Sequence, residues 1–174
     1  LGRSPRSQRL MIAVSGSGIA GLAAALAILR NQKPLLLVAG STPATTLHGG
    51  VQIAPNGWAA LDQLGLGDAA RARATTLKAI TVRDMRSAAT LASLDLSASP
   101  YASLSRAELA SLLKAEINAA SGMTHIAANI THLVQRGPDQ GKALHMLTDD
   151  GGRHVVDALI AADGVSGFGR HYVN

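Results

Sequence analysis

Hydrophobic positions near the start of the chain predict a strand, a helix and a second strand in close succession. Residues 10–14 form a short apolar run, and residues 35–38 form another. Runs of this length are typical of strands buried on both faces. Between them, residues 22–30 are mostly alanine, leucine and isoleucine, and alanine and leucine in particular favour helix. Because strands joined through a helix pair in parallel, we expect a parallel sheet.

Later segments predict further elements of a different kind. Residues 77–84 and 90–96 alternate loosely and are expected to form antiparallel strands. Pro55 and Gly65 suit the start and the end of one helix. Ser105 and Glu108 form a capping box that begins a second helix, which ends near Gly122. Shorter strands are expected at residues 125–127, 130–135, 143–148, 154–156 and 159–162, with a hairpin turn at residues 149–152.

A glycine motif joins the first strand to the first helix. It reads Gly16-Ser-Gly18-Ile19-Ala20-Gly21. In such a motif the first glycine permits a tight turn, the second lets the backbone approach a pyrophosphate, and the third lets helix and strand pack closely. The free N–H groups of the helix start then face the phosphates. The sequence therefore predicts an α/β fold with a Rossmann-like FAD/NAD(P)-binding three-layer core and a small added antiparallel sheet.

One part of this dinucleotide fingerprint is missing. A complete fingerprint has Asp or Glu at the end of the second strand, where the carboxylate binds a ribose hydroxyl. Here that position is Ala39, followed by Gly40. Ser41 or Thr42 could replace the acid only weakly, and no nearby arginine indicates a 2′-phosphate pocket. We therefore expect weaker nucleotide binding than a complete fingerprint would give.

Charge and composition exclude several other classes of function. The net charge is +5, but three of the arginines lie in residues 1–9, which we expect to be a disordered basic leader. Only 2% of residues are aromatic, which argues against nucleic-acid binding through base stacking. No cysteine is present, so thiolate chemistry is excluded and a reducing cytoplasm is the expected location. The six histidines show no spacing typical of a metal site.

A membrane segment is the main competing interpretation of the N-terminal region. Residues 10–29 carry no charge and follow the basic leader, as in a signal peptide or anchor. Ser15, Ser17 and three glycines lower the hydrophobicity of this stretch, so we do not favour a membrane role. One continuous helix over residues 11–29 would support the anchor.

Four segments, taken together, resemble one protein family. They are residues 16–21, residues 49–57 (Gly-Gly-Val-Gln-Ile-Ala-Pro-Asn-Gly), residues 105–109 (Ser-Arg-Ala-Glu-Leu) and residues 159–164 (Leu-Ile-Ala-Ala-Asp-Gly). In this order and spacing the chain resembles the N-terminal half of the FAD-dependent aromatic-ring hydroxylases, the group that includes salicylate and urate hydroxylases. The resemblance runs from about Met11 to Arg170.

The resemblance implies a cofactor and a reaction. Members of this family bind FAD non-covalently, reduce it with NADH or NADPH, and use O2 to hydroxylate a small aromatic substrate. It also implies positions for the cofactor: Gly16 to Gly21 at the pyrophosphate, Ala39 at the ribose, Gln52 beside the flavin nucleotide, Arg106 in a charge-assisted bond, Ile130 at the adenine side through its backbone, and Asp163 with Gly164 in a motif shared with the nicotinamide donor. It assigns no catalytic residue and no metal.

Departures from the family pattern leave alternatives open. Gly167 stands where the family usually has serine, and the chain stops at Asn174. We therefore expect residues 10–174 to form an incomplete FAD/NAD(P)-binding domain whose C-terminal substrate half is missing, inactive alone and prone to self-association through exposed apolar faces. Arg106 could instead be a solvated helix-start residue paired with Glu108. Gln52 could be an outward strand residue, and Asp163 with Gly164 could form an ordinary turn after a strand. A NAD(P)-binding Rossmann oxidoreductase and a non-enzymatic remnant or membrane-anchored module remain as other functions.

Overall fold

The computed structural model describes residues 10–40, 49–135 and 143–172. The leader predicted at residues 1–9, together with Ser41 and Thr42, lies outside these residues. The chain divides into two compact units. The first consists of residues 1–45 and 113–174, and the second of residues 46–112. That residues 10–174 make up one cofactor-binding domain stays a prediction.

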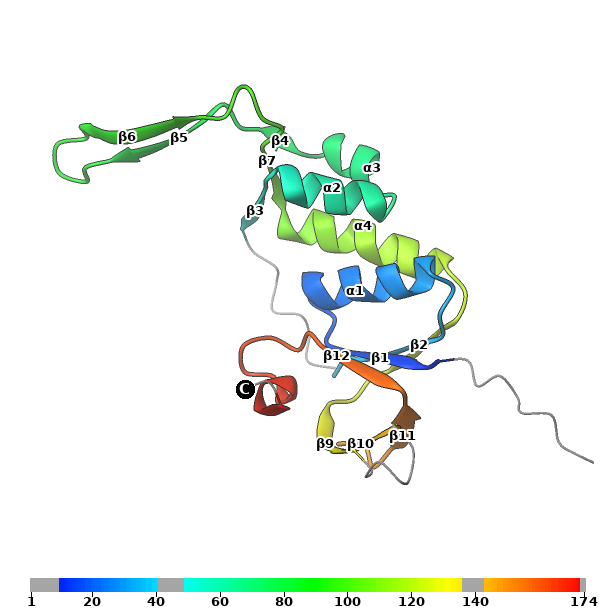
Figure 1. The fold of residues 1–174 in the computed structure, drawn as a ribbon. Helices are drawn as coiled ribbons and strands as arrows, with labels where there is room; N and C mark the ends of the chain where they lie inside the picture. Colours follow the sequence, from blue (N-terminus) through cyan, green and yellow to red (C-terminus); the bar gives the residue numbers. More distant parts are fainter. Residues whose placement is uncertain (1–9, 41–48, 136–142, 173–174) are drawn as a thin grey trace, which may run out of the picture. The chain divides into compact units, whose positions relative to one another are not determined.

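A four-stranded parallel sheet is the centre of the first unit (Figure 1). Its order is β12 (Ala158–Ala161), β1 (Ile12–Ser15), β2 (Leu35–Val38) and β8 (Met123–Ile126). Helix α1 (Ile19–Arg30) leads from β1 to β2, which pair in parallel as the hydrophobic pattern predicts. All four residues of β2 are buried, as expected for a strand covered on both faces.

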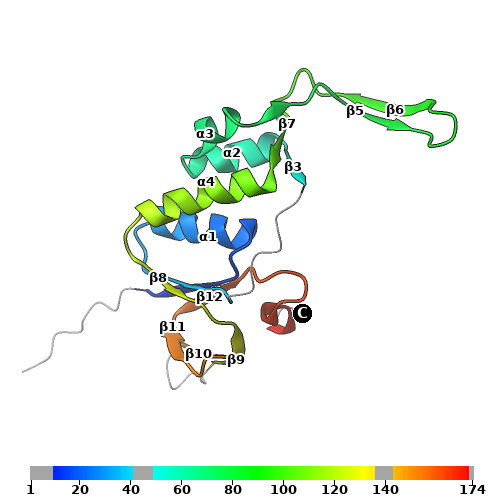
Figure 2. The same cartoon turned by 180° about the vertical axis from the view of Figure 1, so that it is seen from behind.

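The three predicted layers are present in this unit. Helix α1 lies on one face of the parallel sheet, and the antiparallel strands β9 (Ile130–Gln135), β10 (Leu144–Thr148) and β11 (Arg153–Val156) lie on the other (Figures 1 and 2). Ala13, Leu36 and Val38 pack there against side chains of the antiparallel sheet, among them Met146, which is 1% exposed. The added antiparallel sheet is thus itself the third layer of the core.

The second unit is built from shorter elements. They are β3 (Gly50–Ile53), α2 (Pro55–Gln63), α3 (Gly67–Arg71), β4 (Thr75–Thr76), β5 (Ala79–Arg83), β6 (Thr90–Asp95), β7 (Ala102–Ser105) and the first half of α4 (Arg106–Ala119). Strands β3, β7 and β4 form an antiparallel sheet, and β5 pairs with β6 as a separate hairpin. Arg71 donates to both carboxylate oxygens of Asp62 at 2.7 Å and lies 5.0 Å from the Trp58 ring, so it ties α3 to α2.

Most predicted elements are confirmed, with small shifts at their ends. Pro55 begins α2, and Gly65 follows that helix at a φ of +71°. Ser105 Oγ accepts the N–H of Glu108 at 3.0 Å, which is the N-cap bond of the predicted capping box. Helix α4 ends at Ala119, three residues before the predicted end at Gly122. The last strand, β12, ends at Ala161, one residue earlier than predicted, and the 3₁₀ helix η2 (Phe168–Tyr172) follows it.

Other elements were not predicted from the sequence. Strands β3, β4 and β7 and helix α3 have two to five residues each, too few for a hydrophobic period to show. The continuous helix expected of a membrane anchor is not formed, because residues 12–15 are a strand and α1 starts only at Ile19. Within the described ranges, no helix is long and apolar enough to cross a membrane.

Candidate cofactor-binding site

The carboxyl ends of β1 and β12 define the candidate site. These strands lie side by side in parallel, with Ser15 opposite Ala161. Along the chain, β1 is followed by β2 on one side, whereas β12 arrives last on the other side. The strand order therefore reverses beside β1, and in open α/β sheets ligands bind in the crevice outside such a switch point. The glycine motif and the Asp163–Gly164 motif both follow these strand ends.

Two of the three motif glycines are required by close packing. Gly16 has a φ of +98°, and a Cβ built on it would lie 2.4 Å from the carbonyl oxygen of Ala162. A Cβ on Gly21 would lie 2.1 Å from the carbonyl oxygen of Gly16. Any side chain at either position would collide with backbone. The tight turn and the close helix–strand approach predicted for these residues are thus observed.

Gly18 is different, because its open side faces free space. A Cβ built on it would meet nothing within 4 Å. It is the N-cap of α1, and it makes no side-chain capping hydrogen bond. No acidic residue lies in the first turn of this helix. The N–H groups and the positive end of the helix dipole therefore remain available to an anion approaching over Gly18.

A cavity of about 390 Å³ adjoins this turn. Its walls come from Ser15 to Ser17, from Val38 to Gly40 at the end of β2, from Ala128 to Ile130 before β9, and from Asp163 and Ser166 to Phe168. The structure thus brings together predicted site residues from four segments: Gly16, Ala39, Ile130 and Asp163. Its volume lies within the range of small-molecule pockets, about 300–1,000 Å³.

Asp163 is held in place at one wall of this cavity. Its Oδ2 accepts the hydroxyl of Ser15 at 3.1 Å and the N–H of Gly169 at 3.1 Å. Ser15 is only 5% exposed. A Cβ on Gly167 would lie 2.2 Å from Asp163 Oδ1, so glycine at this position leaves room for the carboxylate. The Asp163 side chain therefore joins β1, β12 and η2 at the site.

Ala39 occupies the position of the missing acid. It is 7% exposed, and its N–H donates to the carbonyl oxygen of Ile126 at 3.0 Å, which extends the pairing of β2 with β8. Its methyl group offers no hydrogen bond to a ribose. Ile130 is also buried, at 5% exposure, so only its backbone is suited to polar contact with a ligand.

Gln52 and Arg106 lie in the second unit, and their roles stay predictions. Gln52 is exposed on β3, and its Oε1 accepts the hydroxyl of Tyr101 at 3.3 Å. Arg106 is the first residue of α4, where its N–H donates to the carbonyl oxygen of Gly49 at 3.1 Å. Its guanidinium is exposed, and in the described part of the chain it forms no ion pair with Glu108.

The cavity also contains residues that sequence reasoning did not select. Neither Ser15 nor Asn129 is among the predicted cofactor-binding residues, although both line the cavity. Asn129 follows a strand of the parallel sheet by only three residues, and polar side chains at such strand ends often bind ligands. The position of Asn129 at a strand end could have identified it as a candidate. The sequence does not show, however, that this strand lies beside β2.

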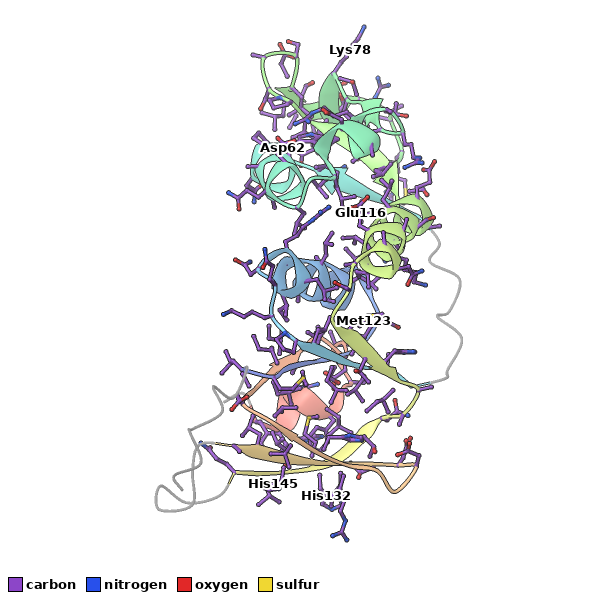
Figure 3. All side chains as sticks on the ribbon, turned by 90° about the vertical axis from the view of Figure 1, so that its right-hand side faces the viewer. Asp62, Lys78, Glu116, Met123, His132 and His145 are labelled. Carbon is purple, nitrogen blue, oxygen red and sulfur yellow. The ribbon has the colours of Figure 1, made fainter. Side chains whose placement is uncertain are left out.

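No histidine within residues 10–40, 49–135 and 143–172 lines this cavity. His132 and His145 lie on the antiparallel sheet and point away from the parallel sheet (Figure 3). Among residues 10–40, 49–135 and 143–172, no cluster of His, Asp and Glu side chains could hold a metal ion.

Comparison with known proteins identifies relatives, although no family model matches the chain. It is 35% identical over 167 residues to 3-amino-4-hydroxybenzoate 2-monooxygenase PtnB3 of Streptomyces platensis, covering 91% of this chain and 40% of that protein. It is 28% identical over 162 residues to 3-hydroxybenzoate 6-hydroxylase 1 of Aquipseudomonas alcaligenes, covering 88% and 40%. The chain therefore spans about 40% of the length of these curated relatives.

Solved structures share the fold. A variant of Klebsiella pneumoniae HpxO complexed with FAD has a TM-score of 0.74 and 25% identity, over 94% of this chain and 42% of that one. A 2-methyl-3-hydroxypyridine-5-carboxylic acid oxygenase has a TM-score of 0.78 and 20% identity, over 92% and 41%, and shows the fold alone. The chain is thus similar to monooxygenases and hydroxylases of aromatic compounds, and it shares the fold of an FAD-binding relative over about 40% of that protein's length.

Proposed function

We propose that this chain is the FAD-binding part of a cytoplasmic flavin-dependent monooxygenase that hydroxylates a small aromatic substrate with NADH or NADPH and O2. The observation that carries the proposal is the cavity at the switch point. The glycine turn, the end of β2, Ile130 and Asp163 all border it, although they come from distant parts of the sequence. The relatives named above are monooxygenases and hydroxylases of aromatic compounds, which supports the same function.

The residues present fit the phosphate part of FAD. Gly18 leaves its open side free for a pyrophosphate, and the start of α1 directs unpaired N–H groups toward it. Ala39 and Ile130 border the region where a nucleoside would lie. The cofactor-binding roles of Gln52 and Arg106, which belong to the second unit, stay predictions. When bound, FAD supplies the redox and oxygen chemistry, which no side chain of this protein could provide.

The protein's own contribution is to bind and orient. The Ser15 hydroxyl and the Gly169 N–H hold the Asp163 carboxylate at the cavity wall, so that its position does not depend on a ligand. Such preorganisation lowers the entropic cost of binding. Because the chain spans about 40% of its relatives, we propose that these 174 residues alone bind FAD without hydroxylating. Hydroxylation requires a flavin shielded from water, and an open site favours unproductive reaction with solvent.

One observation favours a second candidate, an NADP(H)-binding oxidoreductase. A cavity of about 280 Å³ on the other side of the end of β2 is lined by Ala39 together with Lys114 and His125. A nearby cation in place of the ribose-binding acid is what dinucleotide sites use to accept a 2′-phosphate. This arrangement could not be predicted from the sequence because Lys114 and His125 lie far from Ala39 along the chain.

Binding measurements on the purified 174-residue chain separate these functions. Calorimetric titrations with FAD, FMN, NADH and NADPH under identical salt are the test. The monooxygenase proposal requires that FAD binds more tightly than FMN, because only FAD has the pyrophosphate–adenosine part that the fingerprint holds. Binding of NADPH but not FAD would establish the second candidate. Binding of no dinucleotide would leave the non-enzymatic remnant.

A further inference from the structure

We propose that the side-chain amide of Asn129 accepts the hydrogen bond of the adenosine ribose 2′-hydroxyl and thereby replaces the carboxylate that Ala39 lacks. This inference rests on the proposed function, in which FAD occupies the cavity beside the glycine turn. It moves the ribose acceptor from the end of β2 to the segment that joins β8 to β9.

Asn129 lies next to the end of β2 in space. Residues 127–129 connect β8 to β9, and β8 is the parallel neighbour of β2. A Cβ built on Gly40 would lie 2.2 Å from Asn129 Oδ1, so the amide oxygen packs directly against the Gly40 backbone. Asn129, Gly40 and Ala39 all line the cavity of about 390 Å³. The fingerprint expects a hydrogen-bond acceptor at Ala39. Here an acceptor from another segment, Asn129 Oδ1, lies beside the next residue, Gly40.

Asp149 fixes the orientation of this amide. Asn129 Nδ2 donates to Asp149 Oδ2 at 2.8 Å, and the Asn129 backbone N–H donates to Asp149 Oδ1 at 2.9 Å. The Asp149 N–H in turn donates to the Asn129 carbonyl oxygen at 2.9 Å. Because a carboxylate only accepts hydrogen bonds, the amide nitrogen must face Asp149 and Oδ1 must face the other way.

The oxygen that remains is free to accept a bond. In the part of the chain that the structure describes, no group donates to Asn129 Oδ1. Hydrogen bonds from the Asn129 backbone and side chain lower the pKa of the Asp149 carboxyl, so this partner stays ionised at neutral pH. The amide therefore keeps its oxygen toward Gly40, which lines the cavity, at neutral pH.

A neutral acceptor binds a hydroxyl more weakly than a carboxylate does. One neutral hydrogen bond strengthens binding roughly 2- to 12-fold. The wild-type chain should therefore prefer FAD over the analogue that contains 2′-deoxyadenosine by a factor in this range. In the Asn129→Ala variant the two ligands should bind equally. If Asn129 has a purely structural role, the Asn129→Ala substitution should weaken the binding of both ligands alike and leave the ratio of their affinities unchanged.

The experiment is a titration of both ligands, followed by flavin fluorescence. It compares wild type with Asn129→Ala at one salt concentration. Asp149→Ala is a second variant that retains the acceptor but releases its orientation, and it should also reduce the ratio. Ser41→Ala and Thr42→Ala are matched controls, since these hydroxyls are the acceptors that the sequence offers; both should keep the wild-type ratio.

Each outcome separates this inference from the function on which it rests. If wild type binds FAD but shows no preference over the deoxy analogue, the Asn129 assignment is wrong and the FAD proposal stands. If Asn129→Ala retains the preference, or Ser41→Ala removes it, the acceptor is another residue. If wild type does not bind FAD, both proposals fail together.

Discussion

The glycine turn allows folding and cofactor binding to be separated by two matched substitutions. In Gly21→Ala, the new Cβ would lie 2.1 Å from the carbonyl oxygen of Gly16, a backbone atom that cannot rotate away. Relief requires α1 to move from the turn, which costs about 1–3 kcal/mol, and better helix propensity offsets at most about 1 kcal/mol of it. We expect a net loss of about 1–2 kcal/mol in unfolding free energy, or about 2–8 °C in Tm.

Gly18→Val should have the opposite pattern. The backbone of Gly18 has a φ of −70° and a ψ of 178°, which suits a β-branched residue, and its open side meets nothing within 4 Å. Loss of the favoured N-cap glycine and the lower entropy of the unfolded chain oppose each other, so the free energy of unfolding should change by less than about 1 kcal/mol. The valine side chain would occupy the approach to the helix start. Loss of one charge-assisted hydrogen bond to the pyrophosphate would weaken FAD binding by about 10- to 150-fold.

Thermal unfolding by circular dichroism and FAD titration by fluorescence, both at the same salt, measure the two effects. The proposed phosphate site is refuted if the Gly18→Val variant folds and binds FAD as tightly as wild type does. The packing argument is refuted if Gly21→Ala unfolds at the wild-type temperature or above it. Together the two variants show whether the turn serves the fold, the ligand or both.

Three further predictions follow from the same region and from the second unit. Ala39→Glu restores a charged ribose acceptor and should tighten FAD binding roughly 5- to 10-fold beyond the neutral amide, whereas unchanged affinity would contradict the ribose assignment. Asn129→Ala should raise the pKa of Asp149 part of the way toward its ordinary value, as measured by carboxyl NMR titration. The variant keeps the backbone N–H bond, which lowers this pKa most, and loses only the side-chain bond. A depressed folded-state pKa stabilises the protein above the unfolded value near 3.9, and this contribution disappears as pH falls through the folded value, so the variant should lose less stability on acidification. Val82 and Leu94 on the β5–β6 hairpin are 53% and 59% exposed, and we propose that they promote self-association. Val82→Thr combined with Leu94→Lys should shift sedimentation toward the monomer without lowering Tm, and an unchanged distribution would exclude this surface.

Sequence alone was sufficient where the physical determinants are local. Residues 12–15 and 35–38 are strands because short apolar runs next to glycine and proline leave few alternatives. The turn at residues 149–152 joins β10 to β11 as its Asp-Asp-Gly-Gly sequence predicts. The structural roles of Gly16 and Gly21 could also be predicted, since only glycine tolerates the positive φ at residue 16 and the close backbone contact at residue 21.

Tertiary structure alone decided which strand ends meet. The Ser15–Asp163 hydrogen bond joins residues 148 positions apart, and the Asn129–Asp149 pair forms because β9 and β10 bring both residues to one edge of the core. Strands β3 and β7 pair although some 50 residues separate them, and no hydrophobic periodicity in the sequence predicts this pairing. The sequence by itself specifies the glycine turn at residues 16–21 and shows that residue 39 is alanine rather than an acid. Sheet order, which depends on the packing of whole layers rather than on any local pattern, decided that an amide from another strand end lies beside that gap.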